Sequence, residues 1–197
     1  MNTSPYALPE SLTVGGEDRP IRTDYRCMID VIRALNDHEL DSSERAYIAL
    51  VITYKDIGFI TAENAREAFN AAMWFLSGGE RDGSSASEKQ DVRLMDWDQD
   101  FPLIVAPINK AAGCEVRALT YMHWWTFLSY YREIGECSYS TIVAIRHKIK
   151  KHKKLEKWEQ EFYRDHRDLV DLRIEHEYSD AENDMLMRLV QRGDADG

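Results

Sequence analysis

Apolar residues return every three or four positions along most of this chain of 197 residues, and that spacing restricts it to a helical fold. The segment from Tyr25 to Leu35 is typical, with Thr23 or Asp24 placed to cap its first turn. Only the beginning differs, because two short runs of β-forming residues flank Gly15-Gly16 and predict a hairpin over about 8–22. The expected fold is therefore all-α, a multi-helix domain with a short N-terminal β-hairpin and a long C-terminal amphipathic helix.

We expect one helical domain over residues 1–176, followed by a short helix and an acidic tail over 177–197. Inside the domain, residues 77–95 are largely polar and rich in glycine and serine, which predicts a mobile loop. The three cysteines are few and widely spaced, as is typical of reduced thiols in a cytosol. No run of apolar residues approaches the length of a membrane span.

Two helices carry more detailed expectations. Asp41, with Glu44 three residues later, is typical of a capping box, and the helix that it opens is expected to place Tyr47, Leu50, Val51 and Tyr54 on one face. Pro107 lies inside a later apolar segment, where it removes a backbone donor and should kink or split the helix.

The last amphipathic segment carries five apolar residues at heptad spacing with one gap, at Asp165. They are Leu155, Trp158, Phe162, Leu169 and Leu172. This stripe is either a seam that faces a partner or the part of the helix that closes the protein's own core, and the pattern alone leaves both interpretations open.

Charge is unevenly distributed. Lys and Arg number 25 against 35 Asp and Glu, a net charge of −10 that repels nucleic acid and anionic lipid on average. Residues 146–157 nevertheless hold seven basic residues and one acid, whereas residues 171–197 hold eight acids and three bases. This asymmetry suits head-to-tail self-association or a charged protein partner, although a solvated helix face would look the same. The basic run beside Trp158 also leaves a nucleic-acid-binding helix as an alternative.

Motifs for catalysis or metal binding are missing from the sequence. The acidic run from Asp96 to Asp100 resembles half of a calcium loop, but its later ligand positions are Phe101 and Pro107, so an acidic helix cap is the better interpretation. The six histidines show no metal-binding spacing, and no nucleophile or phosphate-loop motif occurs. We predict a protein that is not an enzyme, with no catalytic residue, cofactor or metal.

The run His123-Trp124-Trp125-Thr126-Phe127 is the most distinctive motif in the chain. Together with three other segments it resembles a family of small bacteriophage tail assembly proteins, encoded just before the tape-measure gene. The other segments are Leu8 to Arg26, Trp74-Phe75 with Gly78-Gly79, and Asp96 to Val116. The resemblance covers residues 8 to 150, and Pro102 and Pro107 depart from it.

The resemblance implies a tail assembly chaperone that binds the tape-measure protein and keeps it soluble while the tail tube assembles. It would act in the host cytoplasm and be absent from the mature virion. Self-association and the tail tube protein are further partners, and a minor virion tail component is a further alternative. We expect His123, Trp124, Trp125 and Phe127 to form a signature core, and the apolar stripe to be the partner-binding site.

Overall fold

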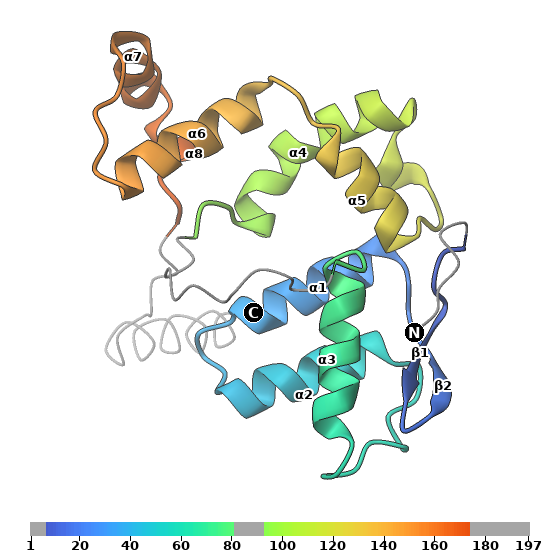
Figure 1. The fold of residues 1–197 in the computed structure, drawn as a ribbon. Helices are drawn as coiled ribbons and strands as arrows, with labels where there is room; N and C mark the ends of the chain where they lie inside the picture. Colours follow the sequence, from blue (N-terminus) through green and yellow to red (C-terminus); the bar gives the residue numbers. More distant parts are fainter. Residues whose placement is uncertain (1–6, 81–92, 174–197) are drawn as a thin grey trace, which may run out of the picture.

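The computed structural model describes residues 7–80 and 93–173, arranged as in Figure 1. Strands β1 (Ser11–Val14) and β2 (Glu17–Pro20) precede helices α1 (Tyr25–Asn36), α2 (Ser42–Thr53), α3 (Ala65–Leu76), α4 (Trp97–Ala112), the 3-10 turn η1 (Val116–Ala118), α5 (Trp124–Arg132), α6 (Ser138–Lys150), α7 (Lys157–Asp165) and α8 (Arg167–Val170). A mostly helical fold with an N-terminal hairpin is thus confirmed. The tail predicted over 177–197 and most of the loop predicted over 77–95 lie outside the described residues.

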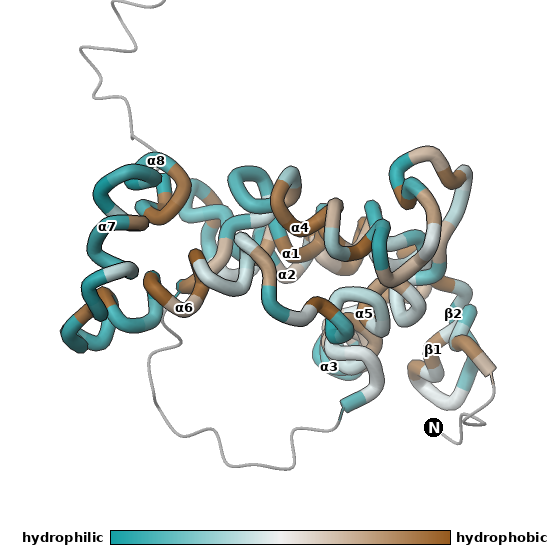
Figure 2. Tube along the Cα trace, turned by 90° about the horizontal axis from the view of Figure 1, so that it is seen from above, coloured by the Kyte–Doolittle hydropathy of each residue, from teal (hydrophilic) through white to brown (hydrophobic). Residues whose placement is uncertain are grey.

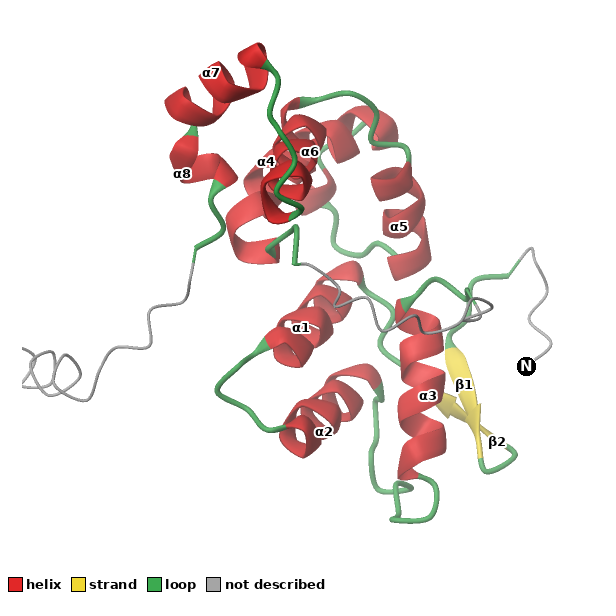
Figure 3. Ribbon diagram, turned by 60° about the vertical axis from the view of Figure 1, so that its left-hand side comes forward, coloured by secondary structure: helices red, strands yellow, loops and turns green. Residues whose placement is uncertain are grey.

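The hairpin is antiparallel, with Leu12 opposite Arg19 and Val14 opposite Glu17. Gly15 and Gly16 have φ values of +60° and +79°, and two consecutive left-handed residues are what the tightest hairpin turn requires. Leu12 and Val14 alternate inward along β1 and are buried. The strand lies beside α3, as Figure 3 shows, so the hairpin covers one flank of the helical core.

The main core is enclosed by the hairpin and helices α1 to α5. Its largest fully buried side chains are Trp124, Tyr25, Tyr54, Phe75 and Phe127. The Tyr25 ring on α1 stacks on the Phe127 ring on α5, with 4.6 Å between centroids. Five aromatic side chains buried together contribute much of the apolar area that this domain removes from water.

Helix α2 begins as predicted and buries part of the predicted face. The Asp41 carboxylate accepts hydrogen bonds from the backbone N–H groups of Ser43 and Glu44, and the Glu44 side chain returns the bond to Asp41, which completes the capping box. Of the four residues expected on one face, Leu50 and Tyr54 are buried, whereas Tyr47 and Val51 are exposed. Apolar residues surround most of α2, so helical spacing alone could not select the inward face.

Helix α4 is continuous through Pro107, so the predicted split does not occur. Ile104, Val105 and Ile108 on either side of the proline are buried, and their packing holds the helix together across the missing hydrogen bond. Asp96 caps the first turn through a 2.7 Å bond from the Gln99 N–H, as the acidic-cap interpretation predicted.

The long C-terminal helix is not confirmed. In the described residues the chain leaves helical geometry after Lys150 and again at His166, which leaves the two short helices α7 and α8. These helices pack on α6 around a second, smaller core of Ile142, Ile145 and Val170. In Figure 2 most of the α7 segment has the colour of hydrophilic residues.

Candidate functional site

The signature residues lie where the N-terminal hairpin, α1, α3 and α5 meet. His123 caps α5, and its backbone forms a short antiparallel bridge with Asp24, the cap of α1. The Trp124 N–H donates to the Thr23 carbonyl at 2.7 Å, and the Tyr25 N–H donates to the Met122 carbonyl at 3.0 Å. The starts of two helices are therefore joined to each other.

Both signature tryptophans hold the C-terminal end of α3. The Trp124 indole N–H donates to the Leu76 carbonyl and the Trp125 indole N–H to the Phe75 carbonyl, each at 2.9 Å. The last carbonyls of a helix have no partner within it, so these two bonds complete the end of α3. Trp124 is buried and Trp125 is half-buried, which shows how two neighbouring tryptophans on one helix both find contacts.

His123 uses both ring nitrogens. Nδ1 accepts a 3.0 Å hydrogen bond from the Trp125 N–H, so Nε2 carries the proton and donates to the Pro9 carbonyl at 3.0 Å. The ring is buried and lies edge-on to Phe75. An imidazole with both nitrogens occupied by backbone groups holds the hairpin to α5 and leaves neither nitrogen for a ligand.

The apolar stripe is mostly turned inward. Leu155, Phe162 and Leu169 are half-buried against the second core, and Leu172 is also half-buried. Trp158, on the first turn of α7, leaves 57% of its surface exposed. In this structure a partner can reach Trp158 directly, whereas the other four residues are largely covered by the protein itself.

The basic run contains two residues that contact carboxylates within the protein and five lysines that are exposed. Arg146 is buried, and Lys148 donates to both carboxylate oxygens of Glu159 at 2.7 and 2.8 Å, which lowers the pKa of that carboxyl group. The other lysines of the run are exposed and form no ion pair with any residue in 7–80 or 93–173; they are Lys150, Lys151, Lys153, Lys154 and Lys157. All five precede Trp158 by no more than eight residues along the chain.

The sequence did not predict one buried ion pair, which joins Asp100 to Arg146. Asp100 and Arg146 are 0% and 3% exposed, and two hydrogen bonds of 2.6 and 2.9 Å join the carboxylate to the guanidinium. Nothing in the sequence distinguishes Asp100 from its neighbours Asp96 and Asp98, since all three look like helix-start acids.

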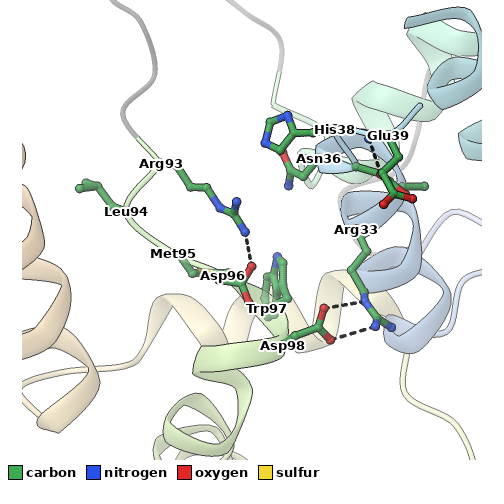
Figure 4. A pocket seen from close by; sticks show the side chains of 12 residues that line it. Arg33, Asn36, His38, Glu39, Arg93, Leu94, Met95, Asp96, Trp97 and Asp98 are labelled. Atoms are coloured by element: carbon green, nitrogen blue, oxygen red, sulfur yellow. Dashed lines mark hydrogen bonds and ion pairs between the residues drawn. The ribbon is translucent and has the colours of Figure 1, made fainter. Parts of the chain in front are cut away.

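A hollow of about 920 Å³ lies between the end of α1 and the start of α4 (Figure 4). Four of its charged groups form two ion pairs, in which Arg33 reaches Asp98 at 2.9 Å and Arg93 reaches Asp96. Among the described residues no group of three His, Cys, Asp or Glu side chains could hold a metal ion. Asp37 and Glu39 also line the hollow, and neither forms an ion pair with another residue in the described part of the chain.

None of the described helices combines the length and the hydropathy needed to cross a bilayer. No curated protein and no solved structure matches the chain. Residues 6–172 match the model of a family described as Bacteriophage Gp15 protein. The match includes the hairpin, the signature residues of α5 and the apolar stripe. The chain belongs to this bacteriophage protein family.

Proposed function

We propose that this protein is a tail assembly chaperone, which binds the tape-measure protein in the host cytoplasm and is absent from the finished virion. Its membership of a bacteriophage family supports the viral setting. The proposed role is binding without catalysis: the chaperone covers apolar stripes of a long helical partner until tail tube subunits polymerise around it. A net charge of −10 would help to keep such a complex in solution.

The observation that carries the proposal is the exposure of Trp158. A tryptophan that leaves 57% of its surface in water costs solvation free energy that a partner can recover, and tryptophan is enriched among the residues that dominate binding energy. Lys157 directly precedes it, and four more exposed lysines lie earlier in the same basic run. The partner that fits is an amphipathic helix with an apolar stripe for Trp158 and acidic residues beside that stripe.

Co-expression with the tape-measure protein of the same phage tests this proposal. We expect a stable complex, with the tape-measure protein insoluble when it is expressed alone. Trp158→Ala should weaken the complex by at least roughly tenfold. Tyr47→Ala is the matched control, because Tyr47 is an aromatic residue of similar exposure on α2, and it should leave binding unchanged. A soluble tape-measure protein that never binds would overturn the function.

The five exposed lysines beside Trp158 favour nucleic-acid binding as a second candidate. Lysines would contact phosphates and Trp158 could stack on an unpaired base. Retention on single-stranded DNA that falls steeply with salt, and that is lost when Lys150, Lys151, Lys153 and Lys154 are changed to Glu, would support it. Retention of the tape-measure protein without DNA retention would favour the chaperone.

A further inference from the structure

The loop between α6 and α7 is held close to Trp158. The Lys153 N–H donates to the Lys148 carbonyl at 2.8 Å, so the chain folds back on the end of α6. The Lys148 ammonium group in turn donates to the carboxylate of Glu159, the residue after Trp158, at 2.7 Å. The loop of residues 151–156 therefore lies between the end of α6 and the first turn of α7.

This region of the surface combines an exposed tryptophan with a surplus of positive charge. Trp158 leaves 57% of its surface in water. Five exposed lysines of the basic run form no ion pair with a residue in 7–80 or 93–173, whereas the exposed acids in residues 150–161 are two, Glu156 and Glu161. A segment that carries both acidic and apolar side chains is the occupant that such a surface favours.

One segment of this chain has that chemistry. Residues 174–197, hereafter the acidic segment, lie outside the described residues, and their sequence holds seven acids and two arginines. Five of those acids occur before Met185, with no lysine or arginine among them. Met185, Leu186 and Leu189 follow at the spacing of one helix face. The acidic segment therefore matches the charge and the apolar character that the surface around Trp158 favours.

The acidic segment begins close enough to reach this surface within one chain. The Tyr163 hydroxyl on α7 donates to the Asp171 carboxylate at 2.9 Å, so the described chain ends beside α7. That helix has nine residues and is about 14 Å long. The twelve residues from Arg173 to Met185 can span up to about 40 Å. Contact with Trp158 therefore requires no movement of α7 or α8.

The exposed tyrosine on α2 is a poorer site for the same segment. Tyr47 and Val51 are exposed one turn apart, but Glu44 lies one turn before Tyr47. Asp41 and Glu39 are also exposed at that end of α2. These carboxylates would repel the acidic segment, so charge complementarity favours Trp158.

We propose that the acidic segment binds over Trp158 and the exposed lysines of its own chain. Its apolar residues cover the indole ring, and the acids that precede them pair with the lysines. A connection of about a dozen residues gives an effective concentration of roughly millimolar, so weak contacts suffice. A partner that binds Trp158 then has to displace the segment. This competition rests on the proposed function, whereas the intramolecular contact does not.

Fluorine NMR of the full chain labelled with 5-fluorotryptophan tests the contact. Trp158→Phe identifies the Trp158 resonance, and the other four tryptophans are internal controls. We expect the combined change Met185→Ser and Leu189→Ser to move the Trp158 resonance alone. Ala195→Ser, a change to serine beyond the apolar stripe, should leave all five in place. A Trp158 resonance that is identical in every form would overturn the proposal.

Charge and dilution test how the segment is held. Changing four lysines to Glu should move the Trp158 resonance in the same direction as the serine changes; they are Lys150, Lys151, Lys153 and Lys154. A contact within one chain should survive dilution of the protein. A resonance that moves on dilution would show that the segment comes from a second copy, and would overturn the intramolecular contact.

Binding of the tape-measure protein tests the competition. We expect Met185→Ser with Leu189→Ser to lower the dissociation constant by roughly threefold to tenfold, as for a surface that is uncovered in about a third to a tenth of the molecules. An unchanged constant would overturn the competition. If the Trp158 resonance moves as expected but no form binds the tape-measure protein, the proposed function fails and the contact stands. If all forms bind and the resonance never moves, the contact fails and the function stands.

Discussion

A Cβ atom on Gly79 would lie 2.8 Å from Cη2 of Trp125, closer than a real Cβ contact allows. Gly79 follows the end of α3, and its φ of +84° lets the chain turn beneath the indole ring. The signature tryptophan and the glycine pair after Trp74-Phe75 are therefore parts of one contact, which explains in physical terms why the two motifs occur together in this chain.

Gly79→Ala should destabilise the protein more than Gly113→Ala. Both glycines have positive φ values, so each substitution costs about 1–2 kcal/mol of backbone strain. Only Gly79 faces a ring, since nothing lies within 4 Å of a Cβ at Gly113. We expect an additional cost of about 1–3 kcal/mol for Gly79→Ala from forced movement of Trp125. Urea unfolding of both variants measures the difference, and equal values would contradict the close contact.

Trp124→Ala should lower the free energy of unfolding by about 3–5 kcal/mol, because it removes a buried side chain and leaves the Leu76 carbonyl without its donor. Trp158→Ala should change it by less than about 0.5 kcal/mol, because that side chain is mostly exposed. Denaturant titration followed by circular dichroism compares the two. A stable Trp124→Ala protein that fails only in partner binding would contradict the structural role of Trp124.

Asp100→Asn should cost about 3–5 kcal/mol of unfolding free energy, because it leaves the buried Arg146 charge without a counterion. The matched control is Asp98→Asn, two residues earlier, whose partner Arg33 is half exposed. That pair lies at the surface, so its loss should cost no more than about 1 kcal/mol. Thermal and urea unfolding distinguish the two, and similar small costs would show that Arg146 is accessible to water.

Docking of α7 should weaken in acid. The hydrogen bond from Lys148 lowers the pKa of Glu159 in the folded protein, so the unfolded state takes up a proton more readily than the folded state. The stabilisation is therefore fully present above the ordinary glutamate pKa and is lost as pH falls through the lowered value. Glu159→Gln should flatten the pH dependence of unfolding free energy between about pH 6 and about pH 3. An unchanged slope would contradict the pairing.

The helix caps and the hairpin turn could be predicted from the sequence, because each depends on a few neighbouring residues. The caps at Asp24 and Asp41 and the turn at Gly15-Gly16 were predicted because each depends on residues within a few positions. The inward face of α2 could be predicted only in part, since its choice depends on how α1 and α3 pack around a helix that is apolar on most sides.

The candidate site was harder to predict, because residues far away in the sequence determine how the apolar stripe folds. The stripe from Leu155 to Leu172 has the spacing of one helix, but Gln99 and Arg146 hold its end in a separate turn. Those two side chains lie 72 and 24 residues from the backbone atoms that they bind. Pattern analysis could identify Trp158 as part of the stripe, but only the packing shows that it is the exposed member.

The bond from His123 to the Pro9 carbonyl spans 114 residues. A contact of such long sequence separation closes a large loop, and its entropic cost has to be met before the contact forms. On a ribosome, the hairpin therefore leaves the exit tunnel long before the residues that hold it have been made. The N-terminal half of the nascent chain keeps part of its apolar surface uncovered through most of translation, and its final packing waits until the two signature tryptophans emerge.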